Sequence, residues 1–212
     1  SSMTLFAWIA IGVGVGTMCS LLSIMYGLES SLRDNVLRAY PHILIRKLAS
    51  ASGKIDVDAL TTTFAKQAGV DRAVPFVETE MIAQTSNRTL GIVVWGIAPS
   101  DWPRIQSGLR AGKIPKADGP EIQGVLGAEL ANHLGVDLQD KVQLISPLRR
   151  QGALGSVPMA HTVAVSGFYE SGHYDFDKQY LFLPIADAQD FVGKGDVITG
   201  WQVWTDDMDA AD

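Results

Sequence analysis

Residues 4–28 contain no charged side chain, and this run limits the possible folds more than any other feature of the chain. At 1.5 Å per residue, a helix of this length reaches roughly 37 Å, enough to cross a hydrocarbon core of about 30 Å. A cleaved signal peptide has a shorter apolar region that follows a basic segment, whereas no Lys or Arg precedes this run. The sequence therefore predicts a transmembrane helix.

An apolar stripe continues past the span at helical spacing, through Leu32, Val36 and Tyr40. One interpretation is a single helix over residues 4–40 that leaves the bilayer as a stalk and transmits movement between the membrane and the polar part of the chain. The other interpretation is an ordinary break near Gly27. The pattern leaves both open.

All charged residues follow Leu28, so the formal net charge of -6 belongs to the polar part of the chain. This acidity argues against nucleic acid as a partner, because neutralising phosphates requires a basic face. The positive-inside rule weakly favours an acidic domain on the far side of the membrane from the cytoplasm. The single cysteine, Cys19, excludes an internal disulfide. We expect the chain to be a piece of a longer protein, cut near both ends.

Period-2 and helical patterns after the span predict an α+β domain. Asp56 is the expected N-cap of a helix over residues 57–68, and Gly69 is expected to end it. Residues 98–119, rich in Pro, Gly and Trp, are expected to connect two units. The expected strands cover residues 42–47, 73–85, 89–97, 124–127, 141–145, 161–168, 180–183 and 198–205, and further helices cover residues 128–134 and 185–192.

The standard spacings of catalytic motifs are absent from the sequence, which has no G-x-S-x-G, H-E-x-x-H, P-loop lysine or C-x-x-C. Gly12, Gly14 and Gly16 imitate a nucleotide loop, but they lie in the apolar span, where small residues favour close helix packing. We therefore predict that the chain is not an enzyme and holds no cofactor of its own.

The nearest approach to a metal site is the segment that contains His173, Asp175 and Asp177. In a strand these three side chains would share one face and could ligate a divalent cation. No second histidine or cysteine lies nearby, so a polar turn is the favoured interpretation and no metal ligand is assigned.

A long connection, residues 146–158, is expected between the strands that end at Ile145 and begin at His161. Hairpin connections usually take two to five residues, so this segment is longer than chain reversal requires. Prolines stiffen both ends, and apolar and basic residues lie between them. A protruding arm that inserts into a partner is slightly favoured over a floppy loop.

Several motifs then occur in a familiar order along nearly the whole chain. They are A-Y-P-H at residues 39–42, G-x-E-L-A-x-x-L-G-V at 127–136, D-K-V at 140–142, G-S-V-P at 155–158, V-S-G-F at 165–168 and T-G-W-Q-V-W at 199–204. This order resembles the LolC/LolE family, the membrane subunits of lipoprotein-releasing ABC transporters. The second motif is shared with the wider superfamily that includes the MacB efflux permease, whereas the G-S-V-P and T-G-W motifs are closer to LolC.

The resemblance implies a four-span permease in the inner membrane of a Gram-negative bacterium, of which this chain holds the first span and a large MacB-like periplasmic domain. That domain would comprise a membrane-proximal subdomain, residues 41–98 and 178–212, and an inserted β-rich subdomain, residues 99–177. The implied partners are lipoprotein cargo, a LolA-like carrier, a LolD-like cytoplasmic ATPase that hydrolyses the ATP, and a second permease subunit or a second copy of the same one.

The resemblance also implies a carrier-binding site. A projecting hook would correspond to residues 147–158, and its candidate binding residues are Pro147, Leu148, Arg149, Arg150, Leu154, Val157 and Pro158. A polar pad beside the hook would include Gln143 and His161. The sequence departs from the family at the pad, which is usually richer in arginine, and at Gln139, where glycine is common.

Two other functions remain as alternatives. A MacB-like efflux permease would use its domain to contact an adaptor protein rather than a lipoprotein carrier. A single-span periplasmic sensor or enzyme would be anchored by residues 4–28 and would lack the three further spans that a permease requires.

Overall fold

The computed structural model describes residues 2–39, 43–47, 56–116, 119–152, 155–192 and 197–205. The chain divides into two compact units, Ser1–Pro41 and His42–Asp212, and each is treated separately below.

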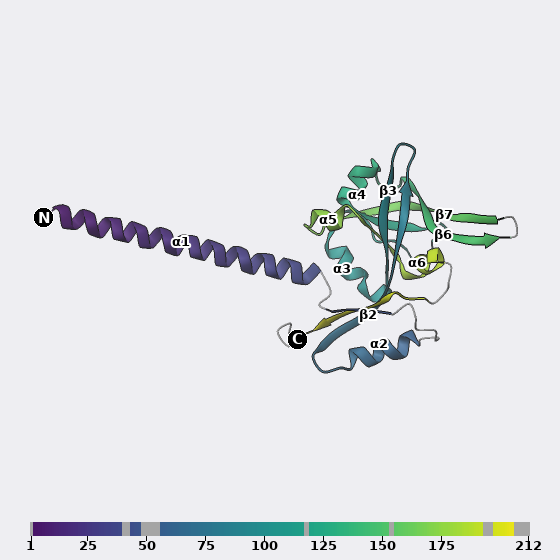
Figure 1. The fold of residues 1–212 in the computed structure, drawn as a ribbon, viewed down its shortest axis with the longest axis horizontal. Helices are drawn as coiled ribbons and strands as arrows, with labels where there is room; N and C mark the ends of the chain where they lie inside the picture. The colour runs from purple at the N-terminus through teal and green to yellow at the C-terminus, as the bar shows by residue number, and fades with distance from the viewer. Residues whose placement is uncertain are drawn as a thin grey trace. The chain divides into compact units, whose positions relative to one another are not determined.

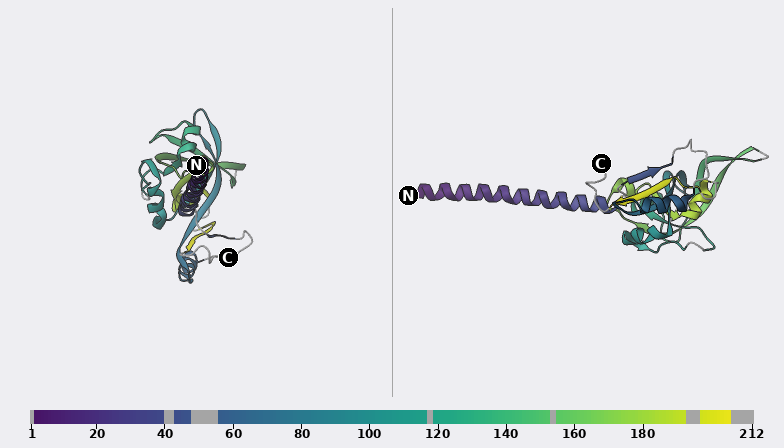
Figure 2. Two further views of the ribbon diagram at one scale, coloured as in Figure 1. Left: turned by 90° about the vertical axis from the view of Figure 1, so that its left-hand side faces the viewer. Right: turned by 90° about the horizontal axis from the view of Figure 1, so that it is seen from below.

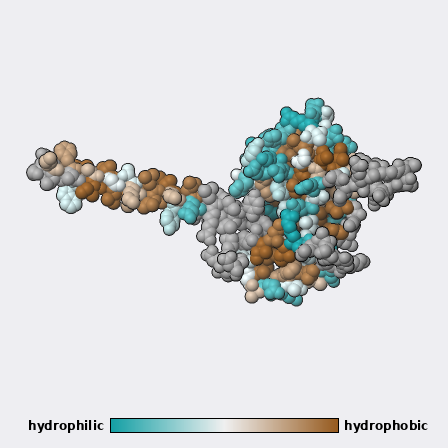
Figure 3. Space-filling view, viewed as in Figure 1, coloured by the Kyte–Doolittle hydropathy of each residue, from teal (hydrophilic) through white to brown (hydrophobic). Residues whose placement is uncertain are grey.

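The first unit is a single α-helix, α1 (Ser2–Ala39), and it runs through Gly27 without a break. Its segment Trp8–Glu29 is long and apolar enough to cross a membrane. Apolar side chains dominate its surface in Figure 3. The hydroxyl of Thr17 donates to the carbonyl of Val13 at 2.6 Å, which satisfies this polar group within the helix as a lipid environment requires. Of the two interpretations left open by the sequence, the structure has the continuous helix, as far as Ala39.

The second unit is built on a sheet whose described strands number nine (Figure 1). They are β1 (Ile43–Arg46), β2 (Val70–Gln84), β3 (Thr89–Ile97), β4 (Leu109–Gly112), β5 (Gln123–Gly127), β6 (Lys141–Gly152), β7 (Gly155–Tyr169), β8 (Tyr180–Pro184) and β9 (Gly200–Thr205). The helices are α2 (Val57–Ala65), η1 (Pro99–Asp101), α3 (Trp102–Ser107), α4 (Ala128–Leu134), α5 (Tyr174–Asp177) and α6 (Ile185–Val192). The predicted α+β class is confirmed.

Six of these strands close into a barrel. The sheet order is β1-β9-β2-β3-β8-β5-β7-β4, and β6 pairs with both β2 and β7, which joins the ends of the run from β2 to β7. Closing a sheet in this way removes the free edges of its strands. Apolar side chains from all six strands fill the interior together with side chains from α4 and α6. Outside the barrel, β1 and β9 extend the sheet from β2 and pack on α2.

The barrel takes strands from both predicted subdomains. β3 and β8 belong to the predicted membrane-proximal subdomain, residues 41–98 and 178–212, whereas β5, β6 and β7 belong to the predicted inserted subdomain, residues 99–177. The division at these boundaries stays a prediction.

The segment at residues 98–119 is more ordered than predicted. It contains η1, α3 and β4 as well as connecting residues, so the expectation of a mere connection was wrong. Trp102 and Ile105 of α3 are buried against aromatic side chains on the outside of the barrel. Burial of these two side chains stabilises a helix of six residues, which is too short to be stable alone.

The Thr-Gly-Trp motif ties β9 to its neighbours. The hydroxyl of Thr199 accepts a hydrogen bond from the backbone N–H of Glu78 at 2.8 Å. A Cβ at Gly200 would lie 1.9 Å from the carbonyl oxygen of Ile45, so only glycine lets β1 approach this closely. Trp201 donates from Nε1 to the hydroxyl of Thr61 in α2 at 2.8 Å. This motif therefore has a structural role.

Gln139 adopts a left-handed backbone conformation with φ +74°. A non-glycine residue there costs roughly 1–2 kcal/mol, while glycine adds about 0.5–1 kcal/mol of unfolded-state entropy. We expect Gln139→Gly to raise the free energy of unfolding by about 0.5 kcal/mol, which thermal denaturation of the full chain in detergent would measure. The matched control is Gly135→Ala, which should be destabilising because Gly135 also has a positive φ. A lower melting temperature for Gln139→Gly would contradict this explanation.

Candidate functional site

The segment predicted to be a long loop is a paired extension of β6 and β7. Backbone pairing joins Arg149 with Pro158, Arg150 with Val157, and Gly152 with Gly155, so the strands do not stop at Ile145 and His161 as predicted. We call the strands β6 and β7 together the β6–β7 hairpin. It projects beyond the rest of the sheet in Figure 1 and in the right-hand view of Figure 2.

The prolines at 147 and 158 indicated a loop, but a two-stranded ribbon can contain proline at suitable positions. Pairing jumps from Ile145 with Ala160 to Arg149 with Pro158, so β6 carries a bulge at this point. A bulge accommodates Pro147, and the outer edge of a two-stranded ribbon accommodates Pro158. Bulges also bend a strand and increase its twist.

The candidate hook residues lie along both strands of this ribbon. The structure describes the backbone of Pro147, Leu148, Arg149 and Arg150 on β6 and of Val157 and Pro158 on β7, but not the surroundings of their side chains. Leu154 lies outside the described residues.

The two candidate pad residues lie on opposite faces of the β6–β7 hairpin. Gln143 pairs with Thr162 and is exposed, whereas Leu144 pairs with His161, and successive residues of a strand face opposite ways. Leu144 belongs to the barrel interior. The structure therefore does not bring Gln143 and His161 together on one face.

His161 lies against α6 at the mouth of the barrel. Its ring stacks on that of Phe191, with centroids 4.0 Å apart and planes at 25°. Burial lowers the pKa of His161, and the negative charge of Asp190 opposes this shift only in part. Burial, and secondarily Asp190, raises the pKa of Asp187 on the same helix. No local pattern predicts the contact between His161 and Phe191, because this contact joins elements that are distant along the chain.

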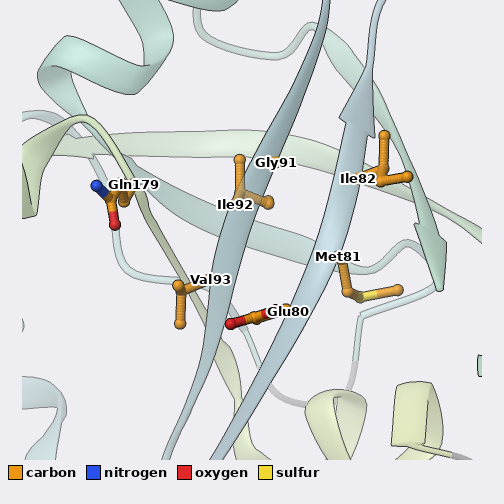
Figure 4. A pocket seen from close by; sticks show the side chains of 7 residues that line it. All are labelled: Glu80, Met81, Ile82, Gly91, Ile92, Val93 and Gln179. Atoms are coloured by element: carbon orange, nitrogen blue, oxygen red, sulfur yellow. The ribbon is translucent and has the colours of Figure 1, made fainter. Parts of the chain in front are cut away.

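A hollow of about 320 Å³ lies on β2 and β3 and was not predicted from the sequence (Figure 4). Because Ile82 pairs with both Gly91 and Ile145, the same face of the sheet continues onto β6. Gly91 has no side chain to fill this space. The hollow is lined by Glu80, Met81, Ile82, Gly91, Ile92, Val93 and Gln179.

The candidate metal ligands His173, Asp175 and Asp177 do not share a strand face, because the segment forms the short helix α5. The buried carboxylate of Asp177 accepts a hydrogen bond from the backbone N–H of Ser171 at 2.9 Å. Asp175 pairs with Lys178 at 2.7 Å, and the hydrogen bond from Lys178 lowers the pKa of Asp175. Within the described ranges, no three His, Cys, Asp or Glu side chains lie close enough to hold a metal ion.

A buried charge cluster on the outside of the barrel also escaped the sequence analysis. The side chain of Asp101 is 2% exposed and pairs with Arg72 at 3.0 Å and with Arg104 at 2.8 Å. The guanidinium of Arg72 lies 4.0 Å from the centroid of Trp204. This cluster joins β2, α3 and β9.

These features define a class of protein: an α+β domain with a closed six-stranded barrel and a projecting hairpin, in a chain with an N-terminal helix long and apolar enough to cross a membrane. The sequence matches the family described as the MacB-like periplasmic core domain over residues 4–212. Because this match covers nearly the whole chain, the chain belongs to that family.

Curated relatives with high similarity to the chain are lipoprotein-releasing system transmembrane proteins LolC. The protein of Xylella fastidiosa is 28% identical over 100% of this chain and 51% of its own length. The protein of Neisseria meningitidis is 26% identical over 89% of this chain and 46% of its own length. The protein of Haemophilus influenzae is 30% identical over 79% of this chain and 42% of its own length. The resemblance to LolC is confirmed. The chain spans about half the length of these relatives.

Solved structures of similar fold include two transporter domains. The extracellular domain of the ABC-type transporter YknZ from Gram-positive bacteria has a TM-score of 0.49 at 16% identity, covering 70% of this chain and 72% of that one. The periplasmic region of MacB from Actinobacillus actinomycetemcomitans has a TM-score of 0.48 at 15% identity, covering 77% and 73%.

Proposed function

We propose that this chain is part of the membrane subunit of a LolC-like ABC transporter, which releases lipoproteins from the inner membrane and hands them to a soluble periplasmic carrier. The projecting β6–β7 hairpin, in a chain whose sequence matches LolC over its whole length, carries this proposal. In this function α1 anchors the domain in the inner membrane and the hairpin contacts the carrier.

The physical problem in such a transfer is the acyl chains of the cargo. Exposing them to water costs about 0.8 kcal/mol per methylene. A carrier must therefore be held close before the lipid leaves the bilayer. The energy would come from ATP hydrolysed by a separate cytoplasmic subunit, because the chain carries no standard catalytic motif.

The second candidate is an efflux permease whose domain contacts a periplasmic adaptor protein. The family match favours it, because the matching domain is described as MacB-like. The two functions differ in the protein that the hairpin contacts.

Carrier binding by the full chain tests the proposed function. Titrating a purified LolA-like carrier into the full chain in detergent should give saturable binding by calorimetry, and a MacB-type adaptor should give none. Binding of the adaptor alone would overturn the proposal in favour of the efflux permease.

The basic residues Arg149 and Arg150 allow a more specific test. Replacing both by Ser should slow carrier association and reduce its dependence on salt, because charges at the rim of an interface act mainly on the association rate. Stopped-flow measurements at two salt concentrations would show the effect. The matched control is Arg110→Ser, which removes an exposed arginine of β4 outside the hairpin. An association rate for the double variant equal to that of the control would contradict a steering role.

A further inference from the structure

His161 occupies the junction between the barrel and the projecting ribbon. It pairs with Leu144, and the bulge in β6 begins after the next pair, Ile145 with Ala160. Its ring stacks on Phe191 of α6, which is 1% exposed and belongs to the barrel core. The stack therefore joins the base of the β6–β7 hairpin to α6.

The surroundings of the His161 imidazole favour its neutral form. Its Nε2 is buried and has no hydrogen-bond partner among the described residues. In the protonated ring both nitrogens are donors, so a buried, charged N–H would lack an acceptor at this position. Leaving a charged donor buried without an acceptor is strongly unfavourable.

The charged group that acts on His161 among the described residues is Asp190 of α6, which attracts the protonated ring. Asp187 lies on the same helix and interacts with Asp190, not with His161. Leu144 across β6 and Phe191 on α6 are apolar. Burial outweighs the attraction of Asp190, so the pKa of His161 falls below its ordinary value of 6.5.

We propose that His161 is a positioning residue that holds the base of the β6–β7 hairpin against α6 while its ring is neutral, and that protonation in mildly acidic conditions loosens the hairpin. Because the folded-state pKa is depressed, the stabilising contact is present above pH 6.5 and is lost as the pH falls through the folded pKa. Its consequence for carrier binding rests on the proposed function.

Hydrogen exchange of the full chain in detergent tests this proposal without a carrier. After correction for intrinsic rates, the protection of residues 141–145 and 159–163 should fall between pH 7.5 and 5.5, because protonation of the ring removes the stabilising contact. Protection of β9 should not change. Unchanged protection at the hairpin base would overturn the proposal.

Three variants distinguish the effect of protonating His161 from the effect of removing its packing on Phe191. His161→Phe keeps a ring to stack on Phe191 and should make protection independent of pH, whereas His161→Ala should lower protection at both pH values. His133→Gln, which removes an exposed histidine on α4, should respond to pH as the wild type does. A pH response of His161→Phe equal to that of the wild type would overturn the proposal.

An NMR titration of the His161 ring uses the wild-type chain, so its outcome does not depend on whether a variant folds. A pKa clearly below 6.5 supports the proposal, and a pKa at or above 6.5 overturns it. Carrier binding measured at pH 7.5 is a separate experiment, because its absence would overturn the proposed function and leave the exchange result for His161 intact.

Discussion

A chain in which residues 147–158 are replaced by a Gly-Gly turn is expected to lose carrier binding and to keep its melting temperature. The remaining strands would still pair through Ile145 and Ala160. The described core clusters are built from residues outside this segment. A projecting ribbon therefore contributes little to the core, whereas as an anchor in a partner it would account for much of the binding free energy.

The matched control for this deletion is a change at another hairpin tip. Ser86 and Asn87 form the turn between β2 and β3, and replacing both with Gly should leave carrier affinity unchanged. Calorimetry on the wild type, the deletion and this control, with circular dichroism for the melting temperatures, would decide the matter. Undiminished carrier affinity in the deletion variant would remove the hairpin from the binding site and favour the efflux permease.

The largest expected loss of stability follows from removing the buried charge of Asp101. In Asp101→Asn, Arg72 and Arg104 would keep their charges but lose the carboxylate that both contact. Breaking a buried ion pair on one side costs about 3–5 kcal/mol. Because Arg72 is 34% exposed, we expect the lower end of this range, about 3 kcal/mol, and a fall in melting temperature of roughly 6–12 °C.

The exposed ion pair between Asp175 and Lys178 is the control for the buried ion pairs of Asp101. Asp175 is 87% exposed, so Asp175→Asn removes an ion pair that water already solvates. Such surface pairs contribute little to stability, because water and salt screen the charges. Chemical denaturation of both variants should separate them clearly, and equal losses would show that Asp101 does not act through its buried charge.

Local signals in the sequence were enough to predict many of the individual elements. The uncharged run from residue 4 to 28 predicts a spanning helix, since length and polarity alone decide whether a helix can cross a bilayer. Asp56 caps α2 as predicted, with its carboxylate accepting from the N–H of Ala59 at 3.0 Å. Gly135 ends α4 in the left-handed conformation for the same local reason.

The closed barrel and the β6–β7 hairpin were decided by tertiary structure. No local pattern predicts that β6 pairs with β2 as well as with β7. These two pairings together close the barrel. The prolines at 147 and 158 locally disfavour strands, but cross-strand pairing at a bulge and an edge accommodates them. Length and composition singled out this segment in the sequence, and cross-strand pairing determines its structure.

The contacts of individual site residues also depend on tertiary structure. Gln143 and His161 were grouped as one pad, but the register of β6 and β7 places them on opposite faces. The partners of Asp101 and of His161 come from other elements, so spacing along the chain carries no signal for them. The sequence by itself determined the membrane helix, most elements and the family, because periodicity, capping and motifs are local. Strand register, burial and charge pairing were decided by the tertiary structure, because they depend on which distant segments the fold brings into contact.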